Sequence, residues 1–484
     1  MKISKKFKIN KSQNELDFID IDINKDKPLF IDPYRMSKLS GPFIDEANGV
    51  INNFFGYLVE LLKAEEFEKA KSIFTNLNEV NETCLGYSKN KPRGNGIGPK
   101  KSSEFFSAIA NSKAAHLGIL ESMEDMKIFV EGINSDRISD MTTNIIRKLL
   151  IEYTQNQCKI FNIPLTSGIA SGMYWDTNSR SWKQEYTDML VINSKRYLLV
   201  PKIIVTYGDR ITTNDYYNQF VLNFMQSENI RNQTKLVQYR KGKTNRGTPF
   251  VTKKDIKEKL LNEEIQKSNI KDWLAGFTNA HPRVFREFKE KSFEKMKDID
   301  YDEDRKQIAD YLIEKLKSIN PGSDQASEYH ITMLCILEFI FYPNISNPKK
   351  ELEINEGRKR IDIVYNNTSN KGFFYELFEK YDIPANFIMA ECKNYSTDIN
   401  NPELDQLLGR FSKKRGKFGF SLSRVCNNKK TLYKRCNDIL KDSDNLIIPL
   451  FDEDILLMLN EIKKGNEKIG EDVLLEKYRN IVFQ

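Results

Sequence analysis

Two carboxylates and one lysine in the last third of the chain have the residue types and spacing for metal-assisted chemistry. Asp362 lies between two isoleucines in the segment EGRKRIDIVYNN, and Glu391 and Lys393 end the apolar segment NFIMAECKNYS. Side chains two positions apart on a strand share a face, so Glu391 and Lys393 project together. If the two segments pair as neighbouring strands, the three side chains converge. Paired carboxylates suit a hard cation such as Mg²⁺, and the lysine would orient an attacking water.

The Glu-x-Lys triplet alone is a weak signal, because further copies occur at 287–289 and 461–463. Both copies lie in helical segments of alternating charge, whereas the copy at 391–393 ends an apolar strand. The alternative interpretation of Asp362, Glu391 and Lys393 is an ordinary salt-bridge cluster at a sheet edge. Because carboxylates buried in strands without a cation are costly, the sequence favours a metal site.

The elements that must position these residues alternate between helix and strand from residue 323 onward. The expected order is a helix over 328–340, strands over 351–355 and 360–365, a helix over 373–380, a strand over 387–393, a helix over 402–411, a strand over 418–424, a helix over 431–440, a strand over 445–450 and a helix after 452. This pattern predicts a mixed α/β domain, with helices flanking a mixed sheet.

The stretch from about 328 to 452 resembles the PD-(D/E)xK nuclease superfamily, whose fold is restriction-endonuclease-like. The triplets at 361–363 (Ile-Asp-Ile) and 391–393 (Glu-Cys-Lys) stand at its two core motifs, although isoleucine replaces the familiar proline before the aspartate. The resemblance implies Mg²⁺, with Mn²⁺ as a substitute, held by Asp362 and Glu391. It covers about a quarter to a third of the chain, and it extends to uncharacterised bacterial restriction-endonuclease-like proteins, several of which belong to defence loci.

The resemblance also implies an acidic residue on the helix before the sheet and a polar residue on the helix after the Glu-x-Lys triplet. Glu338 and Glu328 both qualify for the first role, and Glu338 is preferred because it is closer in sequence to the strand of Asp362. Gln406, in the segment NPELDQLLGRF, stands in the second place. The expected catalytic set therefore adds Glu338 and Gln406 to the two metal ligands and Lys393.

Positive charge gathers just after this site. The segment 406–437 holds ten basic residues and no acidic one. Phosphate neutralisation by such a segment would dominate affinity for nucleic acid and make it salt-sensitive. The alternative is a solvated basic face. The residues expected to bind nucleic acid are Arg410, Lys413, Lys414, Arg415 and Lys417, extended by Arg358, Lys359 and Arg360 before the catalytic strand.

The sequence predicts several parts along the chain. Residues 1–165 are expected to form a mainly helical domain, and 166–285 a mixed α/β region that could belong to the same domain. Alternating charge over 286–317 and the breaker Ser-Ile-Asn-Pro-Gly-Ser at 318–323 predict an exposed helical connector over 286–322. Residues 323–484 are the nuclease-like domain.

Two N-terminal segments carry weaker signals. The glycine- and lysine-rich segment 86–106 could cradle a phosphate, although a plain surface loop is the simpler interpretation and Walker A spacing is missing. Asp188 followed by a strand ending at Lys202 faintly resembles the Asp…Lys pattern, but Val200 stands where the carboxylate would be. A decayed second nuclease-like fold is the lesser alternative.

Composition narrows the classes of function. The 484 residues are too many for one compact core. The chain has only three histidines, and its six cysteines include no CxxC pair. Zinc sites and catalytic triads are therefore not expected, and the unpaired cysteines favour a reduced, cytoplasmic location. A net charge of +7 is small for this length, and no run approaches a membrane span.

Together these features predict a Mg²⁺-dependent DNA endonuclease. The alternatives are an RNase on the same scaffold and a non-cleaving nucleic-acid-binding scaffold protein. Since one such site cuts one strand, a homo-oligomer is expected, with nucleic acid as partner and no membrane association. From the resemblance alone we expect a role in bacterial anti-phage defence or restriction, with a partner protein from the same locus.

Overall fold

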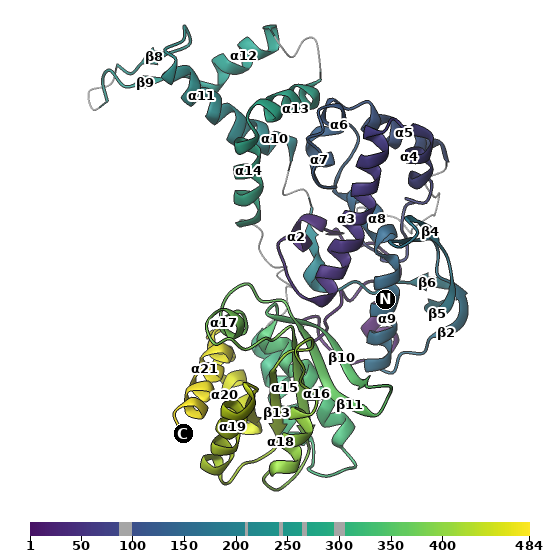
Figure 1. The fold of residues 1–484 in the computed structure, drawn as a ribbon, viewed down its shortest axis with the longest axis vertical. Helices are drawn as coiled ribbons and strands as arrows, with labels where there is room; N and C mark the ends of the chain where they lie inside the picture. Colours follow the sequence, from purple (N-terminus) through teal and green to yellow (C-terminus); the bar gives the residue numbers. More distant parts are fainter. Residues whose placement is uncertain (87–98, 209–211, 242–244, 264–268, 295–304) are drawn as a thin grey trace.

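The computed structural model describes residues 1–86, 99–208, 212–241, 245–263, 269–294 and 305–484 (Figure 1). It is a mixed α/β protein with two large hydrophobic cores. The first core is built from residues between Ile3 and Phe288, and the second from Ile160 together with residues between Ile308 and Ile481. The second core contains the five-stranded sheet that carries the candidate site. No helix among the described residues has the length and apolar character needed to cross a membrane.

The C-terminal sheet has the strand order β10-β11-β12-β13-β14. β11 runs antiparallel to both β10 and β12, whereas β13 runs parallel to both β12 and β14. Parallel neighbours need crossover connections, and helices supply them. The strands are β10 (Ile345–Ile354), β11 (Lys359–Asn367), β12 (Phe387–Lys393), β13 (Phe418–Ser423) and β14 (Leu446–Phe451).

The helices of this part confirm the alternation expected from sequence. α18 begins after Asn400, which caps it in a capping box with Glu403, and Pro402 occupies its first turn. One helix was expected after residue 452, but the structure has two helices there, α20 and α21. The helices are α15 (Arg305–Ser318), α16 (Ala326–Phe341), α17 (Phe373–Glu379), α18 (Asn401–Leu408), α19 (Lys429–Ser443), α20 (Asp452–Lys463) and α21 (Ile469–Val482).

The structure corrects the expected connector over 286–322. α15 lies within that range, but its apolar side chains Ile308, Leu312 and Leu316 are buried in the C-terminal core. The helix packs against α20. The alternating charges lie on the solvent-exposed face of α15. The apolar residues between them, at three- and four-residue spacing, form the buried face of the helix.

The N-terminal part is mainly helical up to residue 160 and mixed beyond it. Within the mixed part, β5 and β6 form a hairpin, whose turn residues Asn193 and Ser194 both have left-handed φ, 51° and 60°. The helices are α1 (Ile3–Lys6), α2 (Pro33–Ser37), α3 (Pro42–Lys63), α4 (Phe67–Phe74), α5 (Pro99–Ala110), α6 (Lys113–His116), α7 (Asp125–Phe129), α8 (Ser135–Ile145), α9 (Arg147–Ile160), η1 (Lys202–Ile204), α10 (Thr213–Asp215), η2 (Tyr216–Val221), α11 (Leu222–Arg231), α12 (Lys253–Glu263), α13 (Ile270–Ala280) and α14 (Pro282–Glu294). The strands are β1 (Leu29–Ile31), β2 (Thr166–Ala170), β3 (Tyr174–Asp176), β4 (Ser181–Lys183), β5 (Tyr186–Ile192), β6 (Lys195–Tyr197), β7 (Val205–Tyr207), β8 (Gln238–Tyr239) and β9 (Pro249–Phe250).

Candidate metal and nucleic-acid site

The site lies where the pairing of β11 with β12 stops. The antiparallel register runs to the pair Ile363–Ala390, and the next position along it would set Asp362 opposite Glu391. β12 meanwhile continues beside β13 as far as Lys393. In place of a main-chain ladder bond, Oδ2 of Asp362 accepts a hydrogen bond from the backbone N–H of Cys392 at 2.9 Å. The aspartate therefore bridges the two strands at the open end of their ladder.

Glu391, Lys393 and Gln406 form a hydrogen-bonded group on one face of β12. Lys393 Nζ donates to Glu391 Oε1 at 2.8 Å and to Gln406 Oε1 at 3.1 Å. Gln406 Nε2, from α18, donates to the same glutamate oxygen. Four of the residues expected at the site therefore lie together: Asp362, Glu391, Lys393 and Gln406. Glu391 and Lys393 share a face because side chains two positions apart on a strand point the same way.

Burial and neighbouring charge set the protonation of this group. Burial raises the pKa of Glu391, the charge of Asp362 raises it further, and Lys393 opposes both. Burial lowers the pKa of Lys393, but the carboxylates of Glu391 and Asp362 outweigh burial and leave the pKa above its ordinary value. Lys393 is therefore an ammonium at neutral pH, a donor rather than a base.

One oxygen of this group is left without a donor. Glu391 is 1% exposed, and its Oε2 is buried with no hydrogen-bond partner among the described residues. A buried carboxylate oxygen without a partner is costly, and a cation would relieve that cost. Asp362, half-buried at the end of the ladder, supplies a second carboxylate. These residues fit a hard cation such as Mg²⁺ or Mn²⁺, whose remaining positions water and phosphate would fill.

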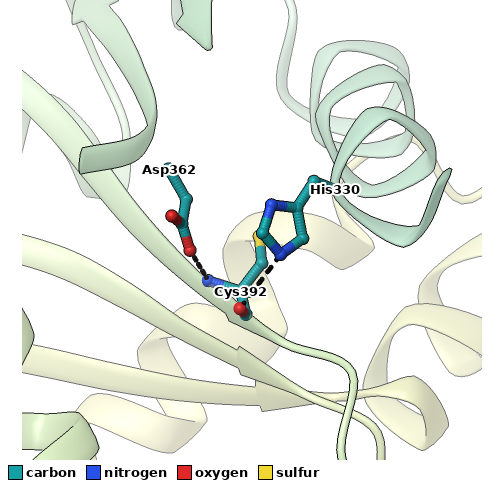
Figure 2. Close-up of side chains that lie close together, drawn as sticks. All are labelled: His330, Asp362 and Cys392. Atoms are coloured by element: carbon teal, nitrogen blue, oxygen red, sulfur yellow. Dashed lines mark hydrogen bonds between the residues drawn. The ribbon is translucent and has the colours of Figure 1, made fainter. Parts of the chain in front are cut away.

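His330 of α16 points toward Cys392 beside Asp362 (Figure 2). Its ring Nε2 lies 3.2 Å from the carbonyl oxygen of Cys392, and because a carbonyl oxygen only accepts, this contact places a proton on Nε2. Burial lowers the pKa of His330, against the attraction of Asp362. The histidine, Asp362 and Cys392 each offer one ligand atom, and the three atoms lie within 4.8 Å of one another.

Glu338, which the resemblance assigned to the catalytic set, lies elsewhere. Its carboxyl group is fully buried, and its Oε1 lies 2.9 Å from Nζ of Lys202, in the N-terminal part. His330 and Glu338 are eight residues apart, which is about 12 Å along a helix. The end of α16 that meets the site therefore carries His330, and the other end carries Glu338 into the boundary between the two cores.

Glu328, the other candidate, pairs with Lys315 of α15 on the surface. His330 was not among the residues expected at the site, because in the sequence it is only one of three scattered histidines. The sequence signal for it was its position near the start of the helix before the sheet, because that end of the helix contacts the end of β12 at Cys392.

Two of the expected nucleic-acid-binding residues border the site. Arg410 lowers the pKa of Glu391, and its Nε is buried without a hydrogen-bond partner in the described part of the chain. Lys359 Nζ donates to the carbonyl oxygen of Gly409 at 2.9 Å. Arg415 Nε donates to the carbonyl oxygen of Arg410 at 2.8 Å, which ties down the loop after α18, and Lys413 and Lys414 are exposed. Positive charge thus flanks the end of α18.

Other residues of the basic segment face acidic partners from outside it. The positive charge that the sequence gathers over 406–437 is therefore partly neutralised in the fold. Arg424 is part of the C-terminal core's polar framework, since it also donates to the carbonyl oxygen of Ile319 at 2.7 Å. The compensated pairs are Arg424 with Asp452 at 2.6 Å, Lys417 with Asp444 at 3.7 Å, and Lys429 with Glu453; before β11, Arg358 lies 3.7 Å from Glu356 and Arg360 lies 3.8 Å from Glu351.

The two N-terminal signals do not add to the site. Most of the segment 86–106 lies outside the described residues. Asp188 is exposed on β5, whereas Lys202 is 1% exposed and paired with Glu338, so the Asp…Lys echo does not form a second site.

Comparison with known proteins adds one finding. A family model described as "Domain of unknown function (DUF8370)" matches residues 8–212. The match covers N-terminal residues and ends before α15, so the candidate site lies outside it. No curated protein matches the chain significantly, and no solved structure does.

Proposed function

We propose that the chain is a divalent-cation-dependent nuclease with a restriction-endonuclease-like C-terminal domain. The observation that carries the proposal is the buried Oε2 of Glu391 beside Asp362, which has no hydrogen-bond partner among the residues that the structure describes, while Lys393 and Gln406 bond to the other glutamate oxygen. Here the protein holds one oxygen in place and leaves the other for a ligand.

The chain's residues divide the work of phosphodiester hydrolysis. Asp362 and Glu391 would hold the cation, which when bound neutralises charge on the phosphate and lowers the pKa of a water. Gln406 fixes the orientation of Glu391 through its amide. Lys393, as an ammonium, orients the attacking water and stabilises the charge that develops on the phosphate oxygens.

The substrate we favour is DNA. Arg410 and Lys359 beside the site, with exposed Lys413 and Lys414, supply phosphate contacts. Because this chemistry does not depend on the sugar, RNA is the second candidate substrate. The third alternative, a non-cleaving nucleic-acid-binding scaffold, leaves the unpartnered oxygen of Glu391 without a purpose.

The test compares Lys393→Met with Lys464→Met, which removes an exposed lysine outside the site. Plasmid, linear duplex, single-stranded DNA and RNA are each incubated with Mg²⁺, Mn²⁺ or EDTA. We expect cleavage with either metal, none with EDTA, a loss of about 100-fold or more for Lys393→Met and no change for Lys464→Met. The proposal fails if no substrate is cut with either metal, or if Lys393→Met cuts as fast as the unaltered chain.

The proposal extends to assembly and context. Cutting both strands of a duplex needs two such sites, so we expect a homo-oligomer, which light scattering measures directly. A cytoplasmic role in anti-phage defence, with a partner protein from the same locus, rests on the resemblance to restriction-endonuclease-like proteins alone.

A further inference from the structure

A second group of ligands lies around Cys392, whose side chain is on the face of β12 opposite to Glu391, and the proposed reaction uses only Asp362 of this group. A ring nitrogen of His330, a carboxylate oxygen of Asp362 and Sγ of Cys392 all lie within 4.8 Å of one another. They come from α16, β11 and β12, and Figure 2 shows Asp362 and His330 on either side of Cys392. Glu391 and Cys392 are consecutive on a strand, so their side chains point to opposite faces.

The backbone of Cys392 orients both His330 and Asp362. Its carbonyl oxygen accepts the Nε2–H of His330 at 3.2 Å, which leaves the lone pair of the neutral ring on Nδ1. Its N–H donates to Oδ2 of Asp362 at 2.9 Å. Metal-binding histidines are commonly held in this way, by donating the second ring N–H to a carbonyl oxygen. Two of the three ligands are therefore positioned by the backbone of the third.

The ligand types select a class of cation. An imidazole nitrogen and a thiolate sulfur suit Zn²⁺ and similar borderline cations, whereas Mg²⁺ prefers oxygen ligands. Zn²⁺ bonds of about 2.0 to 2.3 Å would draw the three side chains together, with water as fourth ligand. Burial raises the pKa of Cys392 well above its ordinary value, so without metal the thiol keeps its proton. On binding, the thiol releases that proton to solvent and the sulfur takes the metal.

We propose that His330, Asp362 and Cys392 form a binding site for Zn²⁺ or another borderline cation. This site overlaps the hard-cation site on the Glu391 face at Asp362 alone. Its existence does not depend on the nuclease proposal, but one consequence does. Because Asp362 would serve both cations, Zn²⁺ inhibits Mg²⁺-dependent cleavage, and a chelator that binds Zn²⁺ but leaves Mg²⁺ in solution relieves the inhibition.

The test uses Co²⁺ as a spectroscopic substitute for Zn²⁺, on the full chain without nucleic acid. We expect a thiolate-to-cobalt charge-transfer band that saturates at one Co²⁺ per chain and is displaced by Zn²⁺ but not by Mg²⁺. Cys392→Ser removes the band, and His330→Ala weakens Zn²⁺ binding by about tenfold or more. Glu391→Gln is the matched control: it alters the neighbouring side chain on the opposite face and keeps the band.

The outcomes separate this inference from the nuclease proposal. Absence of the band, or a band that survives in Cys392→Ser, overturns the zinc site, whatever the chain does to nucleic acid. A band without cleavage of any substrate leaves the zinc site standing and removes the nuclease. If Cys392→Ser does not fold, His330→Ala serves instead, since His330 is only half-buried. Calorimetric titration then compares the Zn²⁺ affinity of this variant with that of the unaltered chain, and equal affinities refute the site.

Discussion

Glu338→Gln should leave cleavage intact and change how stability depends on pH. The carboxyl group of Glu338 is fully buried beside Lys202 and Asp17, and Tyr153 donates to Oδ2 of Asp17 at 2.6 Å while the Asn347 N–H donates to its Oδ1 at 2.9 Å. Burial raises the pKa of Glu338 to about 8, opposed by Lys202 and assisted by Asp17. Two carboxyl groups and one ammonium balance in charge when one carboxyl keeps its proton, and we assign that proton to Glu338.

The direction of the pH effect follows from the raised pKa. An unfolded glutamate has a pKa of about 4.3, so between there and pH 8 the folded protein binds one proton more than the unfolded chain. The contribution of Glu338 to stability is therefore complete below about pH 4.3 and is lost as pH rises through its folded pKa, by up to about 1.4 kcal/mol per pH unit. Because glutamine does not ionise, the stability of the variant does not fall with pH for this reason. The free energy of unfolding of the variant therefore rises relative to that of the unaltered protein as pH rises.

The assay is urea unfolding followed by circular dichroism at intervals from about pH 5 to pH 8, with cleavage measured in parallel. The difference in free energy of unfolding between Glu338→Gln and the unaltered chain should move in favour of the variant by a few kcal/mol over this range. Lys202→Met is the contrasting variant: it leaves a buried carboxylate without its cation and should cost about 3 to 5 kcal/mol at neutral pH.

Two results would refute this reasoning. Stability curves of Glu338→Gln and the unaltered protein that stay parallel with pH would show that Glu338 is ionised in the fold. Loss of cleavage in Glu338→Gln without any change in stability would return the residue to the catalytic set.

Three further predictions concern the C-terminal part. Leu312→Ala should cost about 2 to 5 kcal/mol, because Leu312 is buried in the core, whereas Glu314→Ala on the exposed face of α15 should change the melting temperature little; equal effects would restore the connector interpretation. Arg424→Ala should destabilise the fold by about 3 kcal/mol, while Arg410→Ala should mainly weaken nucleic-acid binding and lower its salt slope by about one, measured by fluorescence anisotropy; the reverse pattern would contradict the assignment of Arg410 to the substrate. Gln406→Ala should slow cleavage by about 10- to 100-fold without loss of stability, and an unchanged rate would show that Glu391 needs no support from α18.

Local periodicity in the sequence determined most of the C-terminal element order. A period of two puts Glu391 and Lys393 on one face of a strand whatever lies beside it, and the Asn-Pro start of α18 fixes where Gln406 falls on its helix. These are properties of neighbouring residues, so the convergence of this group was predictable once the strands were taken to pair.

Contacts between distant segments decided the rest. Whether α16 presents His330 or Glu338 to the site depends on which end of the helix meets β12, and that is set by the packing of α16 between the sheet and the N-terminal residues Asp17 and Lys202. The same reason applies to charge: Arg424 is uncompensated along the chain but paired with Asp452 in space. Periodicity carries no information about the rotation and end-to-end direction of one element against another, so the tertiary structure alone separates the residues that hold the fold from those offered to a ligand.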